Sequence, residues 1–182
     1  MIDFSAITRK SKLLGRIFRT PLNVIPKGTV VPIMQGLLRG KRWVVGASLH
    51  SFWLGSYEID KQKIMAQHIK EGDVFYDIGA NVGFYTLFAA YLVKDSGHVY
   101  AFEPFPQNAA FAEKHIKLND LKNATLFKIA IADQDGTTHF QEGASDGMGK
   151  IDPDGNFEVP VATLDTLIEK GTLRPATILK ID

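Results

Sequence analysis

Apolar and polar positions follow different patterns before and after Gly72. After it, short apolar runs alternate with segments of helical spacing. The runs predict strands at 74–78, 98–102, 125–132 and 177–181, and the spacing predicts helices at 82–93, 107–118 and 163–170. This alternation implies parallel strands with right-handed crossovers, and therefore a doubly wound α/β sheet. Residues 137–141 and 159–161 predict a small antiparallel addition around a polar, glycine-rich loop at 142–156.

Before Gly72 the pattern predicts an extension made of a helix and a β-hairpin. Residues 5–19 have a loosely amphipathic spacing, which Pro21 ends. Two apolar runs within 29–47 predict the hairpin, with Pro32 typical of an edge strand. A helix is predicted at 57–70. We therefore divide the chain into a basic extension, 1–57, and a domain, 58–182, which we expect to be truncated at its C-terminal end after the fourth core strand.

Composition excludes several classes of site. The 182 residues are 45% hydrophobic and 23% charged, as in an ordinary soluble domain. With no cysteine, the chain forms no disulfide, thiolate metal site or cysteine nucleophile. The five histidines lack ligand spacing, so we predict no metal site. The apolar runs are shorter than a membrane span and no signal peptide is evident, so we expect a cytoplasmic protein.

Charge is distributed unevenly along the chain. Residues 1–57 contain nine Lys/Arg and one acid, whereas the rest contains twelve Lys/Arg and nineteen Asp/Glu. The basic extension could make a peripheral contact with an anionic surface, or it could dock on the acidic domain. We do not expect a nucleic acid partner.

One segment carries the candidate chemistry, the turn Asp77-Ile78-Gly79-Ala80-Asn81-Val82-Gly83 between a strand and a helix. The glycines allow backbone angles and close packing that a side chain would forbid. We expect such a turn to bring main-chain N–H groups against a ligand at a helix start. About twenty residues later the next strand ends in Glu103, the usual spacing of a ribose-binding acid.

The acid at the start of the turn distinguishes two adenosine-containing ligands. A dinucleotide fingerprint has three glycines that let the backbone approach a pyrophosphate. Here only Gly79 and Gly83 are present, and Asp77 would repel a pyrophosphate but attract the ammonium of a methionine moiety. The pattern therefore favours S-adenosylmethionine as cofactor.

These residues resemble the FkbM family of methyltransferases, which have the class I methyltransferase (Rossmann-like) fold and mostly methylate oxygen. The resemblance covers residues 54–182. It is carried by Leu54-Gly55-Ser56-Tyr57-Glu58, Asp77 to Thr86, Phe102-Glu103-Pro104 with Asn108, Ala130-Ile131-Ala132-Asp133, Thr163 to Leu167, and Leu179-Lys180-Ile181-Asp182. In the family, Val-Glu-Gly and a further acid follow the last segment, and the chain ends before them.

The resemblance implies a role for each candidate residue. It assigns the cofactor's methionine and ribose end to Asp77, Gly79, Ala80, Asn81 and Gly83, and the ribose to Glu103 with Pro104. Ala130 and Ile131 would lie along the adenine, or they are simply apolar strand residues. Tyr57 and Glu58 would lie near the cofactor, or Glu58 simply favours the start of a helix.

Two carboxylates keep alternative roles. Asp77 could instead cap the N–H groups of the next helix. Asp182 would orient or deprotonate an acceptor hydroxyl, or it caps a helix. His50, just before Tyr57, is a further candidate base.

The resulting hypothesis is an S-adenosylmethionine-dependent methyltransferase, acting on a hydroxyl of a sugar or small natural product. The alternatives are a truncated or non-catalytic Rossmann-like cofactor-binding domain and a nicotinamide-dependent oxidoreductase.

Overall fold

The computed structural model describes residues 22–142, 149–151 and 154–182, and the chain divides into two compact units, 1–68 and 69–182. The helix predicted at 5–19 lies outside the described residues. The predicted domain boundary falls after residue 57, so it differs from this division by one helix. None of the helices in the described ranges combines the length and apolarity needed to cross a membrane.

The first unit is a small β-hairpin with short helices. Its elements are η1 (Leu22–Val24), β1 (Val30–Pro32), β2 (Arg42–Val44), α3 (His50–Trp53) and α4 (Ile59–His68). β1 and β2 pair antiparallel, as the sequence predicted. Trp43 is fully buried and stacks on Phe52 with ring centroids 5.5 Å apart, which packs α3 against the hairpin.

The second unit contains a parallel sheet and a smaller mixed sheet. Its elements are β3 (Val74–Ile78), α5 (Phe84–Val93), β4 (His98–Phe102), α6 (Pro106–Leu118), β5 (Ala124–Phe127), β6 (Ala130–Ile131), β7 (Gly136–Glu142), β8 (Gly149–Ile151), β9 (Phe157–Ala162), α7 (Leu164–Glu169) and β10 (Ile178–Ile181).

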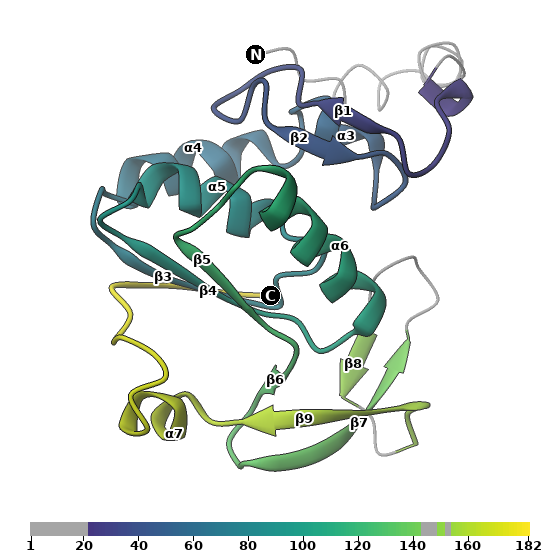
Figure 1. The fold of residues 1–182 in the computed structure, drawn as a ribbon. Coiled ribbons are helices and arrows are strands. Elements are labelled where there is room, and N and C mark those ends of the chain that lie inside the picture. Colours follow the sequence, from purple (N-terminus) through teal and green to yellow (C-terminus); the bar gives the residue numbers. More distant parts are fainter. Residues whose placement is uncertain (1–21, 143–148, 152–153) are drawn as a thin grey trace. The chain divides into compact units, whose positions relative to one another are not determined.

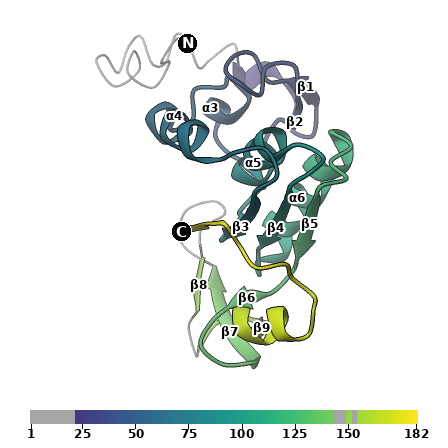
Figure 2. The same ribbon diagram turned by 90° about the vertical axis from the view of Figure 1, so that its left-hand side faces the viewer.

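The parallel sheet has the strand order β10-β3-β4-β5, with every pair parallel. Helices α5 and α6 cover one face, and α7 lies on the opposite face (Figures 1 and 2). Alternate residues of a strand point to opposite faces, so Tyr76 and Phe102 pack toward α7 while Asp77 points toward α5. The predicted doubly wound α/β fold is confirmed.

The chain reverses direction around the sheet between β3 and β10. From β3 it proceeds through β4 to β5 on one side, and it returns to place β10 on the other side. In open α/β sheets, ligands bind beyond the carboxyl ends of the strands at this switch point. The Asp77–Gly83 turn, whose first two residues end β3, lies at this point, and so does Asp182, which follows β10.

The prediction of one strand at 125–132 is wrong. β5 ends at Phe127, and β6 joins the second sheet, of order β6-β9-β7-β8. Lys128 and Ile129 separate the two strands, and Lys128 forms an ion pair with Glu113 of α6. A continuous apolar run does not reveal that its two ends belong to different sheets, because both ends are apolar for the same reason, namely burial.

Candidate functional site

The Asp77–Gly83 turn has a backbone that only particular residues tolerate. Gly79, Asn81 and Gly83 have φ angles of +73°, +51° and +85°. Asn is among the few residues with a side chain that enter this left-handed region readily. A Cβ at Gly83 would lie 3.0 Å from the Ala112 Cα, so this glycine lets α5 start directly against α6.

The five N–H groups of this turn all donate within the protein. Those of Gly79 and Ala80 donate to the Phe102 carbonyl, at 3.0 and 2.9 Å. The Asn81 N–H donates to Glu103 Oε2 (2.7 Å), the Val82 N–H to Asn81 Oδ1 (2.7 Å), and the Gly83 N–H to the Ala80 carbonyl (2.9 Å). The expectation that these groups face a ligand is therefore corrected. They hold the turn against β4 instead.

Glu103 fixes the turn as well as lying at the tip of β4. Its carboxylate accepts from the N–H groups of Asn81 and Phe105 and from the Asn108 side chain. A carboxylate has about four acceptor positions, so roughly one remains for a ligand rather than two. Burial raises the pKa of Glu103 above its ordinary value, while these hydrogen bonds act in the opposite direction.

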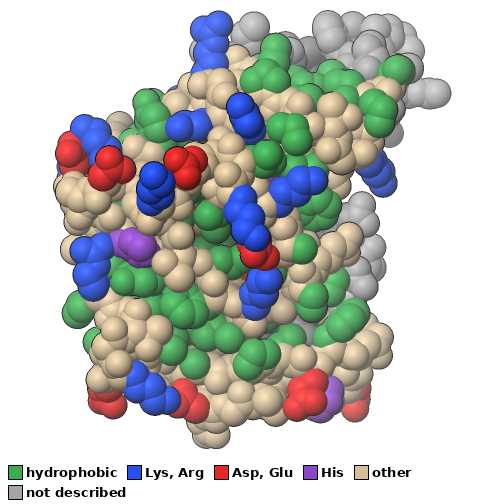
Figure 3. Space-filling model, in the orientation of Figure 1, with side chains coloured by type: hydrophobic (Ala, Val, Ile, Leu, Met, Phe, Trp, Pro, Cys, Tyr) green, Lys and Arg blue, Asp and Glu red, His purple; other side chains and the backbone are tan. Residues whose placement is uncertain are grey.

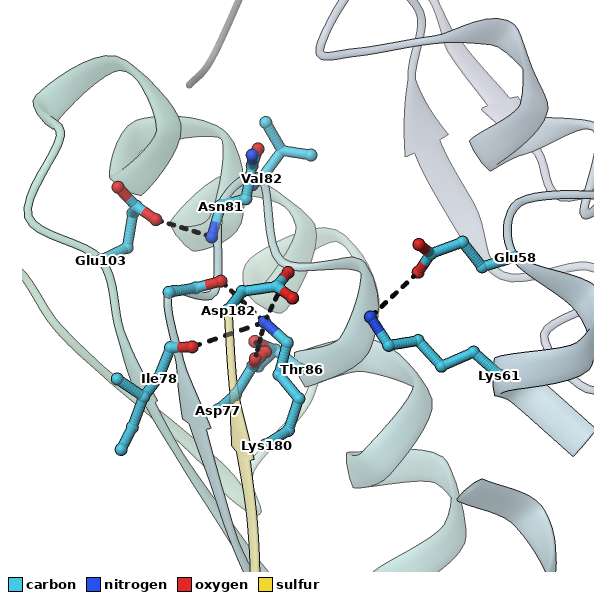
Figure 4. Close-up of polar contacts among 11 residues, drawn as sticks. Glu58, Lys61, Asp77, Ile78, Asn81, Val82, Thr86, Glu103, Lys180 and Asp182 are labelled. Atoms are coloured by element: carbon cyan, nitrogen blue, oxygen red, sulfur yellow. Dashed lines mark hydrogen bonds and ion pairs between the residues drawn. The ribbon is translucent and has the colours of Figure 1, made fainter. Parts of the chain in front are cut away.

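Asp77 lies fully buried in a network of charged and polar groups (Figure 4). The Thr86 hydroxyl donates to its Oδ2 at 2.7 Å, and the Lys180 Nζ lies 3.1 Å from its Oδ1. Lys180 comes from β10, whose register places it directly beside Asp77. Thr86 lies in the first turn of α5, so this hydroxyl ties Asp77 to the start of that helix, and the alternative role of Asp77 as a cap of the helix N–H groups stays a prediction.

Asp182 is the more open carboxylate of the site. Its side chain is 54% exposed and lies 3.2 Å from the Lys180 Nζ. Its own N–H donates to the Ile78 carbonyl at 3.2 Å. A Cβ at Gly79 would lie 3.3 Å from the Asp182 carbonyl oxygen, so the absence of a side chain there leaves room for this approach.

His115 supports the turn from α6. It is buried, and its Nδ1–H donates to the Val82 carbonyl at 2.8 Å. Burial lowers the pKa of His115 to about 4. The ring is therefore neutral at pH 7, and it acts as a structural donor.

The remaining predicted residues make contacts within the protein. Ala130 belongs to an apolar cluster with Phe105, and Ile131 packs beside the α7 face of the sheet. Adenine contact by these two residues stays a prediction. Pro104, half-buried, separates Glu103 from Phe105 in the bend that the Phe105 N–H closes.

Tyr57 and Glu58 belong to the first unit. The Tyr57 ring stacks on Phe52, and its carbonyl accepts from Gln62. Glu58 precedes α4 with a φ of +42° and pairs with Lys61 at 3.3 Å (Figure 4). Their contact with the cofactor also stays a prediction, as does a role of His50 as a base.

Sequence reasoning missed the roles of Lys180, Thr86 and His115. Lys180 had a detectable pattern, since a lysine at the centre of an apolar strand shares its face with Asp182 two residues later. Parallel pairing with β3 would then have placed this lysine beside Asp77. Thr86 and His115 stand at ordinary helical positions, and no local pattern distinguishes them.

The fold and this site define an α/β domain of the class I methyltransferase type. The methyltransferase FkbM domain matches residues 77–182, more than half of the chain, and the chain therefore belongs to this family. This membership confirms the family resemblance found in the sequence and the predicted class of enzyme domain, a methyltransferase.

Among curated proteins, the chain is similar to the hexuronic acid methyltransferase AglP of Haloferax volcanii. The two are 23% identical over 129 residues, which is 69% of this chain and 51% of the relative. The chain thus spans about half the length of the curated relative that it matches.

Solved structures match over parts of their lengths. A putative rRNA-methylase of Clostridium thermocellum is 28% identical, with a TM-score of 0.38, and 39% of each chain is covered. An S-adenosylmethionine-dependent O-methyltransferase of Thermotoga maritima is 22% identical, with a TM-score of 0.39, over 63% of this chain and 43% of that one.

Proposed function

We propose that this chain provides the cofactor-binding part of an O-methyltransferase whose acceptor is a hydroxyl of a sugar or small natural product. Membership of the FkbM family supports methyl transfer. The sugar acceptor is suggested by the distant relative, whose name specifies hexuronic acid. A cytoplasmic location is part of the same proposal.

Two features of this turn support S-adenosylmethionine as its ligand. Its N–H groups are all used within the protein, and the side chains around it are acidic. Because all five N–H groups from Gly79 to Gly83 are used internally, the turn offers no backbone cradle to a pyrophosphate. Asp77 and Asp182 provide two carboxyl groups beside one ammonium, that of Lys180, and Glu103 holds a third carboxyl group against the Asn81 N–H of the same turn. Such a site fits a cation better than a polyanion.

The proposed roles follow from the positions of these groups. Glu103 binds the ribose through its remaining acceptor position, and the turn it holds supports the methionine end. S-adenosylmethionine, when bound, supplies a methyl group activated on a sulfonium. Asp182 orients the acceptor hydroxyl and accepts its proton, while exclusion of water and alignment of the acceptor account for the rest of the rate.

Calorimetry with S-adenosylmethionine and NAD tests the cofactor assignment. We expect the chain to bind S-adenosylmethionine and not NAD, and Glu103→Gln to weaken binding by tenfold or more because a buried hydrogen-bonded acceptor is lost. The matched control is Glu113→Gln, an exposed change on α6. NAD binding without S-adenosylmethionine binding would establish the oxidoreductase alternative.

Transfer of a labelled methyl group to uronic acid glycosides tests the reaction. Asp182→Asn should retain cofactor binding and lose transfer. Cofactor binding with no transfer to any sugar or small hydroxylated acceptor would favour a non-catalytic cofactor-binding domain.

We also propose that the first unit makes a peripheral contact with an anionic lipid surface. Residues 22–57 contain four basic residues and no acid. Several large apolar side chains of this unit are exposed, at Val24, Val30, Met34, Leu37 and Leu49. Over β1 and β2, Figure 3 shows hydrophobic and basic side chains side by side, a combination typical of membrane-surface contacts.

A further inference from the structure

The Lys180 ammonium occupies a buried position at the switch point of the sheet. The side chain is only 9% exposed. Its Nζ lies 3.1 Å from Asp77 Oδ1 and 3.2 Å from Asp182 Oδ2, and it donates to the Gly79 carbonyl at 2.8 Å. It also lies 5.7 Å from the centroid of the Tyr85 ring. A buried ammonium with this many acceptors is held in one place.

This position makes Lys180 the counter-charge of Asp77. Without the lysine, this fully buried carboxylate would keep the hydrogen bond from the Thr86 hydroxyl but would lose its opposite charge. An uncompensated buried charge is unfavourable and projects a strong field, since water does not screen it. Two carboxylates and one ammonium leave this group of side chains with one net negative charge.

The cofactor and its product differ by one charge at the reacting atom. S-adenosylmethionine has a sulfonium, whereas S-adenosylhomocysteine has a neutral thioether. The field at the turn therefore determines the relative affinity of the two ligands. Lys180 reduces the negative field that Asp77 and Asp182 would otherwise exert on a sulfonium.

We infer that Lys180 is a specificity-determining residue, whose buried ammonium balances Asp77 and thereby sets the preference of the site for S-adenosylmethionine over S-adenosylhomocysteine. This inference rests on the proposed function, since it assumes that the cofactor lies against the Asp77–Gly83 turn. Lys180 acts through charge and through its bond to the Gly79 carbonyl, and it takes no part in the transfer itself.

The test is the ratio of the two dissociation constants, measured by calorimetry on the whole chain. Lys180→Met removes the ammonium and keeps most of the side-chain volume. We expect it to shift the ratio about tenfold toward S-adenosylmethionine, the size of one unit charge acting over several ångströms in a partly buried site. Asp77→Asn should shift the ratio in the opposite direction, and the double variant should return it toward the original value.

Two controls separate this effect from general ones. Lys180→Arg keeps the charge and should keep the ratio. Lys128→Met removes an exposed charge from the same unit and should also leave the ratio unchanged. A purely structural role of Lys180 would weaken both ligands equally, which would overturn the inference.

The possible failures are distinguishable. If the unaltered chain binds neither ligand, the proposed function is wrong. If it binds both and the ratio does not respond to Lys180→Met, only the charge-balancing role is wrong. Should Lys180→Met fail to fold, Asp77→Asn carries the test alone, and an unchanged ratio or a shift toward S-adenosylmethionine would overturn the role.

Discussion

At the scale of single residues, the turn is shaped by groups whose burial alters their chemistry. Asp77 is opposed by a lysine, Glu103 is satisfied by backbone donors, and His115 is kept neutral. Of the three, His115 gives the most direct measurement, because its pKa in the folded chain is about 4 and that in the unfolded chain is about 6.5.

We predict that the chain loses stability as the pH falls from about 6.5 to 4, in part because of His115. In this window the unfolded chain binds a proton at His115 and the folded chain does not, so protonation favours unfolding. The free energy of unfolding falls by about 3 kcal/mol by the time the pH reaches the pKa of His115 in the folded chain. Urea unfolding at pH 7 and pH 4.5 measures this loss.

His115→Gln should flatten this part of the pH dependence, since the amide can donate to the Val82 carbonyl but does not titrate. The matched control is His139→Gln, a change at an exposed position of β7 that should keep the full slope. If the unaltered chain and His115→Gln lose the same stability between pH 7 and pH 4.5, His115 is not the cause of the loss.

At the scale of elements, the contact between α5 and α6 depends on Gly83. We predict that Gly83→Ala destabilises the fold by about 2–4 kcal/mol, because a Cβ adds both backbone strain at φ +85° and a 3.0 Å contact with the Ala112 Cα. The loss of cofactor binding should accompany it, since the same residue ends the turn.

The control is Gly171→Ala, just after α7, where φ is +69° and a Cβ would meet nothing within 4 Å. This change should cost only the strain, about 1 kcal/mol. Urea unfolding of both variants separates packing from strain. Equal losses would show that α5 and α6 do not depend on close approach at Gly83.

The elements also show how much the sequence could predict. The period of apolar positions located β3, β4, α6 and β10 to within a residue or two, because each of these elements is buried along a regular face. The same period could not separate β5 from β6, where one apolar run serves two sheets. It also missed α3, a single turn too short to show a period.

For the candidate site, sequence reasoning located the residues better than it assigned their contacts. The turn and Glu103 lie next to each other as predicted, since both follow the carboxyl ends of neighbouring parallel strands. The use of every N–H from Gly79 to Gly83, and the pairing of Asp77 with Lys180, depend on strand register and side-chain rotamers. Neither can be read from the spacing of residues in the chain.

At the scale of the whole molecule, charge is distributed unevenly along the chain. Residues 22–57 are basic without a single acid, whereas residues 58–182 hold nineteen acids and twelve bases. Beside the basic residues, the segment between β1 and β2 exposes Met34 and Leu37. An anionic bilayer would bind both kinds of side chain, since its headgroups attract cations and its interior accepts apolar side chains.

We predict that the chain binds vesicles containing phosphatidylserine more tightly than vesicles of phosphatidylcholine, and that salt weakens this binding. Lys27→Gln with Arg39→Gln should reduce binding about thirtyfold, given roughly 1 kcal/mol for each of the two basic residues near the surface. Met34→Ser with Leu37→Ser should reduce binding to both kinds of vesicle, because insertion of apolar side chains does not depend on lipid charge. Co-sedimentation at several salt concentrations measures these effects.

The control is Lys61→Gln with Lys63→Gln, which removes two charges from α4 of the same unit, where each lysine is paired with a neighbouring acid. If this pair weakens binding as much as Lys27→Gln with Arg39→Gln, net charge alone explains the association and the hairpin has no special role. If vesicle binding depends neither on lipid charge nor on the hairpin variants, the proposed contact with an anionic surface is wrong. Docking of the basic segment on the acidic domain would then be the better explanation of the uneven charge.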